Sequence, residues 1–311
     1  MSLERAVELA ESAKRRAYPK PTVGAVLVAD GVIVGEGATE ESGRHGEIVA
    51  LEAAGELARG ATLFVTMEPC AHHGTTPPCV DALLSAGVSR VVAGSLDPNP
   101  AAQGGLERLR AGGVEVEHAD SFEARRQNEA WRTWVALGRP FVAYKAAMTL
   151  DGRVTVPGER WVSGEASRRR VHELRAASDA VAVGMGTVRL ENPRLDARDV
   201  DAKRQPRRLA FGSGPLPDGS ELELRSGPLV DELRALAAEG VQSLLLEGGP
   251  TLAGAFLEAG LVDKLLLFVA PTLSGTGPGL LESLSEPIQL TRLSSRQVAE
   301  DVLLEAYLRE P

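Results

Sequence analysis

The sequence predicts two α/β domains, and three observations carry this prediction. Its 311 residues are about twice the length of a typical domain. Short apolar strand patterns alternate with amphipathic helix patterns along the whole chain, which is typical of α/β architecture. The run Gly138-Arg139-Pro140 interrupts this pattern near the middle. We therefore expect one domain at 1–138 and a second at 139–311.

Composition narrows the class of function. The chain is 43% hydrophobic and 25% charged, as in ordinary globular proteins. A net charge of −9 argues against a nucleic-acid or membrane-surface role, because such proteins carry a basic surface. The first residues do not resemble a signal peptide and no segment is apolar enough to span a bilayer. We therefore expect a cytoplasmic protein with reduced thiols. The net charge does not exclude a small anionic ligand, because local arginines could still bind it.

The elements of the first part follow from hydrophobic periodicity and turn residues. The dipeptide Asp30-Gly31 between two apolar runs predicts a tight hairpin. The expected helices cover 3–16, 45–58, 78–86, 103–111 and 122–136, and the expected strands cover 23–28, 32–35, 61–66, 88–93 and 114–116. This order predicts a sheet whose later strands are parallel.

Both cysteines and a histidine suggest a metal site in this part. His45 begins one expected helix and Cys70 precedes the next, with Cys79 nine positions later. Helix N-termini stabilise a thiolate, and three such ligands suit a zinc ion that keeps one position open for water. Glu47 lies two positions after His45 and could transfer protons. The sequence therefore predicts a catalytic zinc bound by His45, Cys70 and Cys79, with Glu47 as the catalytic residue.

Two simpler interpretations stay open. His72 or His73 could complete a closed, purely structural four-ligand site. Glu47 could be a solvated carboxylate at a helix start.

The second part is also expected to be α/β. The expected strands cover 141–147, 180–184, 207–211, 242–246, 261–269 and 300–308, and the expected helices cover 165–177, 230–238 and 252–258. The Gly-x-Gly-x-x-Gly fingerprint of Rossmann domains is absent. The segment Glu247-Gly248-Gly249 between a strand and a helix could bind phosphate through its amides, or could be a structural turn.

The order His-x-Glu followed by Pro-Cys is the signature of zinc deaminases. The long spacing of the cysteines within 68–79, together with 23–26 and 97–100, resembles the deaminase half of the bifunctional riboflavin-biosynthesis deaminase/reductase family. This resemblance implies a cytidine-deaminase-like α/β/α fold. It also implies hydrolytic deamination of 2,5-diamino-6-ribosylamino-4(3H)-pyrimidinone 5′-phosphate, with Glu47 transferring protons and His72 binding substrate.

The second part resembles the reductase half of the same family. The resemblance rests on Lys145 with Asp151-Gly152-Arg153, on 183–188, on Asn192-Pro193 and on 247–249. It implies a dihydrofolate-reductase-like fold, NADPH as cofactor, reduction of a ribosyl group to ribityl, and self-association through this part. The implied cofactor contacts are Trp161, Thr187, Glu191, Ser213, Gly249, Pro250, Thr251, Leu252, Ala253, Gly254 and Ala255. The implied substrate contacts are Lys145, Asp151, Arg175, Leu195, Arg198 and Glu247.

For Lys145 and Asp151 we expect substrate positioning or proton transfer, with a structural ion pair as the alternative. In the run Arg168-Arg169-Arg170 we expect a solvated helix face.

Several positions depart from the family pattern. Lys20 stands where the family usually has asparagine, Gly46 where it has alanine, and Thr75 where it has lysine or arginine. Glu191 replaces a usual aspartate, and the stretch 213–242 is short. We hypothesise that Lys20 supplies the positive charge lost at Thr75.

Two other functions compete with this interpretation. One is a zinc deaminase of another nucleoside or of a base in nucleic acid, with an altered reductase-like domain. The other is a non-catalytic scaffold held together by zinc. The acidic chain opposes the first, and Glu47 opposes the second.

Overall fold

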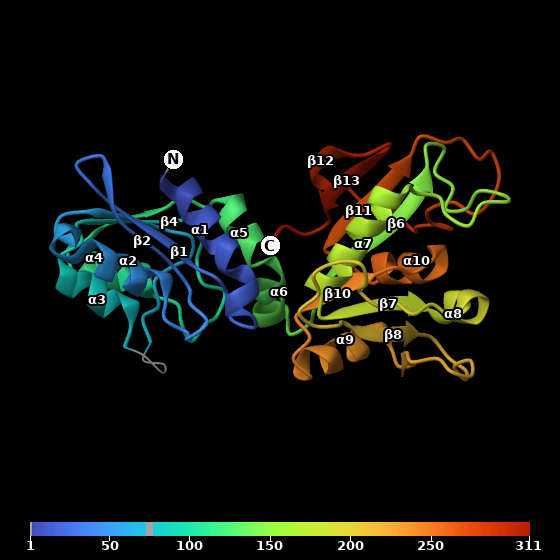
Figure 1. The fold of residues 1–311 in the computed structure, drawn as a ribbon. Helices are drawn as coiled ribbons and strands as arrows, with labels where there is room; N and C mark the ends of the chain where they lie inside the picture. The colour runs from blue at the N-terminus through green and yellow to red at the C-terminus, as the bar shows by residue number, and fades with distance from the viewer. Residues whose placement is uncertain (1, 73–76) are drawn as a thin grey trace. The chain divides into compact units, whose positions relative to one another are not determined.

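The computed structural model describes residues 2–72 and 77–311, and these form two compact units. The chain passes from one unit to the other between Leu137 and Gly138 (Figure 1). Each unit is built on its own β-sheet. Within the part of the chain that the structure describes, no helix is both long and apolar enough to cross a membrane.

The first unit contains a five-stranded sheet in the order β2-β1-β3-β4-β5. Its strands are β1 (Gly24–Ala29), β2 (Val32–Ala38), β3 (Thr62–Val65), β4 (Arg90–Ala93) and β5 (Glu115–His118). β1 is antiparallel to β2 and β3, whereas β3, β4 and β5 are parallel. The hairpin predicted at Asp30-Gly31 is confirmed, with positive φ angles of 49° and 77° at these two residues.

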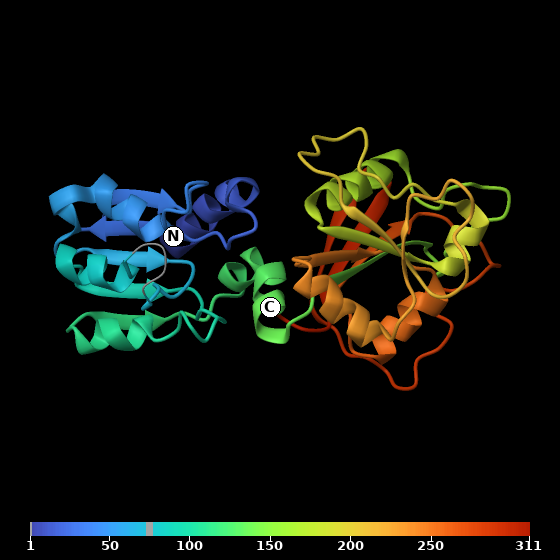
Figure 2. The ribbon, with the colours of Figure 1, turned by 90° about the horizontal axis from the view of Figure 1, so that it is seen from below.

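Helices cover both faces of this sheet. They are α1 (Ser2–Ala17), α2 (Gly46–Ala54) continued by a 3₁₀ turn η1 (Gly55–Ala58), α3 (Cys79–Ala86), α4 (Gly105–Ala111), α5 (Phe122–Gln127) and α6 (Glu129–Leu137). Figure 2 shows α2, α3 and α4 side by side, coloured from blue to green. They share one apolar core with the sheet through Ala25, Leu27, Ala50, Leu63, Leu83 and Leu109. α1 packs on β1 and β3 and contacts α5, so the unit has three layers.

The second unit contains an eight-stranded sheet in the order β12-β13-β11-β6-β10-β7-β8-β9. Its strands are β6 (Phe141–Thr149), β7 (Ala180–Gly184), β8 (Arg207–Phe211), β9 (Glu223–Arg225), β10 (Ser243–Leu246), β11 (Lys264–Ala270), β12 (Thr291–Val298) and β13 (Asp301–Tyr307). The strands from β11 to β9 are parallel, and β13 and β12 are added antiparallel at one edge.

Two apolar cores lie on opposite faces of this second sheet. Its helices are α7 (Glu165–Ala177), α8 (Met185–Glu191), α9 (Leu229–Ala238) and α10 (Pro250–Glu258). α9 and α10 bury Leu233, Leu236, Ala253 and Phe256 in one core. α7 and α8 bury Val171, Met185 and Val188 in the other. The unit is therefore a sheet covered by helices on both sides.

Some predicted elements need correction. The helix expected at 122–136 is two helices separated at Asn128, because the Asn128 side chain bonds the backbone N–H and C=O of Thr22 at 2.9 and 2.8 Å. Helix α8 and strands β9 and β12 were not predicted. β12 is polar and exposed along nearly its whole length, so it carries little hydrophobic pattern. The strand expected at 300–308 is present as β13.

Candidate active site

The predicted zinc ligands converge in the first unit. Nδ1 of His45 lies 3.2 Å from Sγ of Cys79 and 3.7 Å from Sγ of Cys70. All three ligand atoms lie within 4.8 Å of one another. A tetrahedral zinc with bonds of about 2.0–2.3 Å places its ligand atoms roughly 3.5 Å apart. One imidazole and two thiols at these spacings therefore fit a zinc ion.

The N-termini of two helices position these ligands. His45 is the N-cap residue of α2, and its side chain makes no capping hydrogen bond. Cys79 is the first residue of α3, and its backbone N–H donates to Sγ of Cys70 at 3.3 Å. The hydrogen bond from the Cys79 thiol lowers the pKa of Cys70 to about 4, although burial opposes this shift. The pKa of Cys79 is raised, by the same hydrogen bond and by burial. The backbone N–H of Cys79, at the start of α3, also contributes to the lowered pKa of Cys70, but less than the Cys79 thiol does.

Gly46 allows α2 to begin this close to the sheet. A Cβ at Gly46 would lie 2.4 Å from the carbonyl oxygen of Val23. A Cβ at Gly37 on β2 would lie 2.3 Å from the carbonyl oxygen of Gly46. The departure from alanine at position 46 is therefore a packing requirement in this chain.

Glu47 lies in the first turn of α2 and is 2% exposed. Burial raises the pKa of its carboxyl group, and the nearby His45 opposes this shift. Its Oε2 atom is among the buried side-chain oxygens that lack a hydrogen-bond partner within the residues described. Because an unpaired buried oxygen costs free energy, it indicates a functional role. The interpretation of Glu47 as a solvated carboxylate is wrong.

Lys20 lies beside this site. Its Nζ would be 2.6 Å from a Cβ at Gly43, in the loop just before His45. The hydrogen bond with Cys70 raises the pKa of His45, and the positive charge of Lys20 acts in the opposite direction. The segment after Lys20 is held by the Thr22–Asn128 hydrogen bonds.

His72 is not in the ligand cluster. His72 is exposed, and no fourth His, Cys, Asp or Glu joins the ligand group over 2–72 and 77–311. His73 and Thr75 lie outside the described residues.

A second cluster of charges lies in the other unit. Glu247, at the end of β10, accepts hydrogen bonds from Nε and Nη2 of Arg175 at 2.6 and 2.9 Å, and pairs with Nζ of Lys145 at 3.0 Å. The side chains are only 8% exposed for Glu247 and 14% for Lys145. Burial would raise the pKa of Glu247, but the two cations together lower it to about 2. The structure therefore brings together β6, α7 and the end of β10.

Two residues missed by sequence analysis extend this cluster. The carbonyl oxygen of Asp196 accepts from Nη1 of Arg175 at 3.2 Å, and its carboxylate accepts from Arg198 at 2.7 Å. Nδ1 of His172 lies 3.1 Å from the same carbonyl oxygen. Leu195 is buried with a φ angle of +53°. The alternating charges of 194–198 were a signal for Asp196, whereas nothing in the sequence indicated His172.

Asp151 is not part of this cluster. Its carboxylate accepts hydrogen bonds from Oγ1 of Thr149 at 2.6 Å and from the N–H groups of Ser274 and Gly275 at 3.0 and 2.8 Å. These bonds lower its pKa to about 2. Lys145 pairs with Glu247 rather than with Asp151, so the alternative of an ion pair stays open for Lys145 through a different partner.

Residues implied for cofactor contact follow the carboxyl ends of neighbouring parallel strands. Thr187 follows β7, Ser213 follows β8, and Gly249 follows β10, and these strands are adjacent in the sheet. Ligands of α/β sheets commonly bind at such an edge. Gly249 is the N-cap residue of α10, which contains the implied residues Pro250 to Ala255. Glu191 is the exposed last residue of α8.

Trp161 lies in the segment between β6 and α7 and is 52% exposed. The guanidinium groups of Arg160 and Arg168 lie 5.0 and 5.4 Å from its ring centre. Arg168 also donates to the carbonyl oxygen of Ser163 at 2.6 Å. The sequence predicts a solvated side chain for this arginine, whereas the structure shows it bonded to the backbone and close to an aromatic ring.

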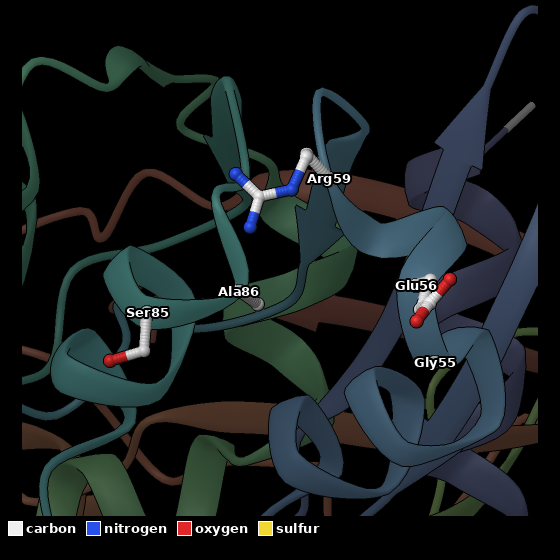
Figure 3. A pocket seen from close by; sticks show the side chains of 5 residues that line it. All are labelled: Gly55, Glu56, Arg59, Ser85 and Ala86. Carbon is white, nitrogen blue, oxygen red and sulfur yellow. The ribbon is translucent and has the colours of Figure 1, made fainter.

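A hollow in the first unit lies away from the ligand cluster. It is lined by Gly55, Glu56, Arg59, Ser85 and Ala86 (Figure 3). These residues lie at the C-terminal ends of α2 and α3, whereas His45 and Cys79 lie at their N-terminal ends. It is therefore not part of the candidate zinc site.

Comparisons with known proteins identify a related family model for each part of the chain. Residues 1–95 match the family model of the cytidine and deoxycytidylate deaminase zinc-binding region, and residues 140–304 match that of the RibD C-terminal domain. The riboflavin biosynthesis protein RibD of Mycobacterium tuberculosis is 44% identical, over 88% of this chain and 85% of its own. That of Aquifex aeolicus is 36% identical, over 96% and 95%.

Two solved structures are similar over nearly the whole chain. RibD of Acinetobacter baumannii is 32% identical with a TM-score of 0.84, covering 98% of this chain and 97% of that one. A Thermotoga maritima protein described as a diaminohydroxyphosphoribosylaminopyrimidine deaminase/5-amino-6-(5-phosphoribosylamino)uracil reductase is 34% identical, with a TM-score of 0.82 and the same coverage.

Proposed function

Because the chain belongs to the family of bifunctional riboflavin-biosynthesis deaminase/reductases, we propose that residues 1–138 carry the deaminase and residues 139–311 the reductase. The chain is a hydrolase and an oxidoreductase of riboflavin biosynthesis. Its cytidine-deaminase-like and dihydrofolate-reductase-like fold class is as predicted.

For the deaminase, the observation that carries the assignment is the buried Glu47 oxygen, which has no hydrogen-bond partner among the residues that the structure describes, beside the His45, Cys70 and Cys79 cluster. These three residues would hold zinc, which when bound makes water acidic near neutral pH. Glu47 takes the proton from the attacking water and delivers it to the leaving amine. The amine of the pyrimidine leaves as ammonia and a carbonyl replaces it. His72, which is exposed two residues after Cys70, contacts the substrate.

For the reductase, Lys145, Glu247 and Arg175 form the substrate side of the site. Glu247 fixes the orientation of both cations, so Lys145 can position the sugar and supply a proton to its oxygen. Arg198 is more exposed than Arg175, at 46% against 13%, and is better placed to reach a phosphate. We also assign Leu195 to the substrate contacts, and Asp151 acts by holding the loop at 274–275.

NADPH supplies the hydride for this reduction. We assign its contacts to the edge of the sheet formed by the ends of β7, β8 and β10. The residues concerned are Trp161, Thr187, Glu191, Ser213 and Gly249 to Ala255.

The remaining assignments concern partners and location. We propose a cytoplasmic enzyme that binds small molecules rather than nucleic acid or membranes. Self-association through the second unit is supported by β12, an edge strand whose one partner among the described strands is β13 and which carries Leu293 at 69% exposed. Light scattering of the purified chain tests this, and a monomer at micromolar concentration would contradict it.

The test of function is incubation with the diaminopyrimidine ribosyl phosphate, with and without NADPH, while ammonia and NADPH absorbance are followed separately. We expect ammonia release in both cases and NADPH oxidation only after deamination. Glu47→Gln should stop both signals with this substrate but leave reduction of the deaminated compound intact. Faster turnover of cytidine or a tRNA would favour another deaminase, and no ammonia from the zinc-loaded chain would favour a scaffold.

A further inference from the structure

Helix α4 is held tightly against the segment that carries Cys70. The buried Glu68 accepts hydrogen bonds through Oε1 from the N–H groups of Gly104 and Leu106, both at 3.1 Å. A Cβ at Gly105 would lie 1.8 Å from the carbonyl oxygen of Pro69. The start of α4 therefore cannot move relative to the chain at Pro69 without breaking these contacts.

Arg108 lies one turn further along α4 and contacts one residue next to Cys70 and one residue close to Cys79. Its Nη1 donates to the carbonyl oxygen of Ala71 at 3.2 Å, and its Nη2 donates to Oδ1 of Asp81 at 2.5 Å. Ala71 directly follows Cys70 in the sequence. Asp81 lies in the first turn of α3, two residues after Cys79. One guanidinium group thus connects the chain beside one thiol to the chain beside the other.

We propose that Arg108 is a positioning residue that keeps Cys70 and Cys79 at the separation that the metal requires. This inference rests on the proposed zinc site. Ala71 is adjacent to Cys70 and Asp81 is two residues from Cys79, and holding these two chain segments in one arrangement costs conformational entropy. Without Arg108, the bound metal would have to hold Cys70 and Cys79 in place by itself, so its release would become faster. The planar guanidinium matters because it presents two donors to two different acceptors at once.

The competing interpretation is an ordinary surface ion pair. The side chains of Arg108 and Asp81 are 44% and 38% exposed, and such pairs add little to folding stability. An unfolding temperature would therefore not separate the two interpretations. The rate at which zinc is released does separate them, because it responds to the geometry of the ligands.

The experiment uses the zinc-loaded full chain and a chromophoric chelator in excess, with the rate of zinc transfer as readout. Changes to residues that support metal ligands commonly weaken metal binding by about 10–100-fold. Arg108→Met should accelerate zinc release by about 10-fold, at the lower end of this range, because Arg108 contacts neighbours of the ligands and not the ligands themselves. Arg108→Lys should show an intermediate rate, because an ammonium group reaches only one acceptor well. Arg110→Met is the matched control, since Arg110 is exposed on the same helix, and it should release zinc at the wild-type rate.

Asp81→Asn provides a second variant if Arg108→Met does not fold. Asp81→Asn should accelerate zinc release less than Arg108→Met does. The double variant should release zinc at nearly the same rate as Arg108→Met alone. Wild-type release from Arg108→Met, or equal acceleration in Arg110→Met, would overturn this role while the zinc site stands. A wild-type chain that takes up no zinc would overturn the proposed deaminase site itself, and this role with it.

Discussion

The carboxylate of Glu47 has an arrangement that suits proton transfer better than fold stability. It is buried at the start of α2, its Oε2 atom has no hydrogen-bond partner among the described residues, and it follows His45 by two residues. A charged group in such a place would be costly if it only supported the fold. A role in transferring a proton from the reacting water explains why the chain keeps the group despite this cost.

Glu47→Gln should therefore remove deamination and little else. The amide has nearly the same shape but cannot accept a proton, and loss of a general acid–base residue typically costs about 10²–10⁴-fold in rate. Ammonia release under saturating substrate measures the effect, and zinc content by mass spectrometry serves as the control. Retention of more than about a tenth of the wild-type rate, with zinc bound, would contradict the role of Glu47.

Lys20 is the residue for which we predict a phosphate-binding role at the rim. Lys20→Ala should raise the deaminase KM for the phosphorylated substrate about 3–30-fold and leave kcat nearly unchanged, as expected for loss of one charge-assisted contact. The same pyrimidine riboside without its phosphate is the control, and its KM should not change. An unchanged KM for the phosphorylated substrate would refute the hypothesis.

Glu247 joins three separate elements of the second unit. It directly follows β10 and contacts Lys145 from β6 and Arg175 from α7. Removing one partner of such a buried set leaves the others uncompensated, which is far costlier than losing an exposed pair. The same contacts connect folding to the arrangement of the reductase site.

This cluster predicts a pH dependence of stability. The pKa of Glu247 falls from 4.5 to about 2 on folding, so its contribution is present above about pH 4.5 and is lost as the pH falls toward 2. The contribution is on the order of 3 kcal/mol. Urea unfolding of the β6 and β10 segments, read by pulsed hydrogen exchange between pH 5 and 2, measures it.

Glu247→Gln is the control for this prediction. Its unfolding free energy should be lower at pH 7, and it should change much less between pH 4.5 and 2. An equally steep loss of stability in the variant would assign the pH dependence to other carboxylates.

The two chemistries of the whole molecule use separate groups of residues. The proposed zinc ligands lie between residues 45 and 79, and the charged cluster that we propose for the reductase lies between residues 145 and 247. The two clusters belong to different compact units.

Chelation should therefore separate the activities. Dialysis against a strong chelator should abolish ammonia release, while reduction of the deaminated substrate by NADPH stays within about 2-fold of its initial rate. Added zinc should restore deamination. A parallel loss of both activities would show that zinc also supports the fold of the second unit.

Much of this protein follows from patterns within short stretches of sequence. The Asp30-Gly31 hairpin and most helices and strands were predictable, because turn residues and hydrophobic periodicity act locally. His45, Glu47, Cys70 and Cys79 were predictable because their residue types and spacing allow few alternatives. The break at Asn128 was not, because its cause is a hydrogen bond to Thr22, 106 positions away.

The sequence by itself determined the family and the two reactions, and it predicted the cluster of His45, Cys70 and Cys79 that the structure brings together, since these depend on residue chemistry in a fixed order. Tertiary packing determined which charges meet. Arg175 reaches Glu247 across 72 positions, and Arg108 reaches Ala71 across 37, because helices and strands from distant segments are adjacent. It also decided that Lys145 pairs with Glu247 rather than Asp151 and that position 46 must be glycine. The physical reason is that contact distances depend on how surfaces pack, which no short stretch of chain encodes alone.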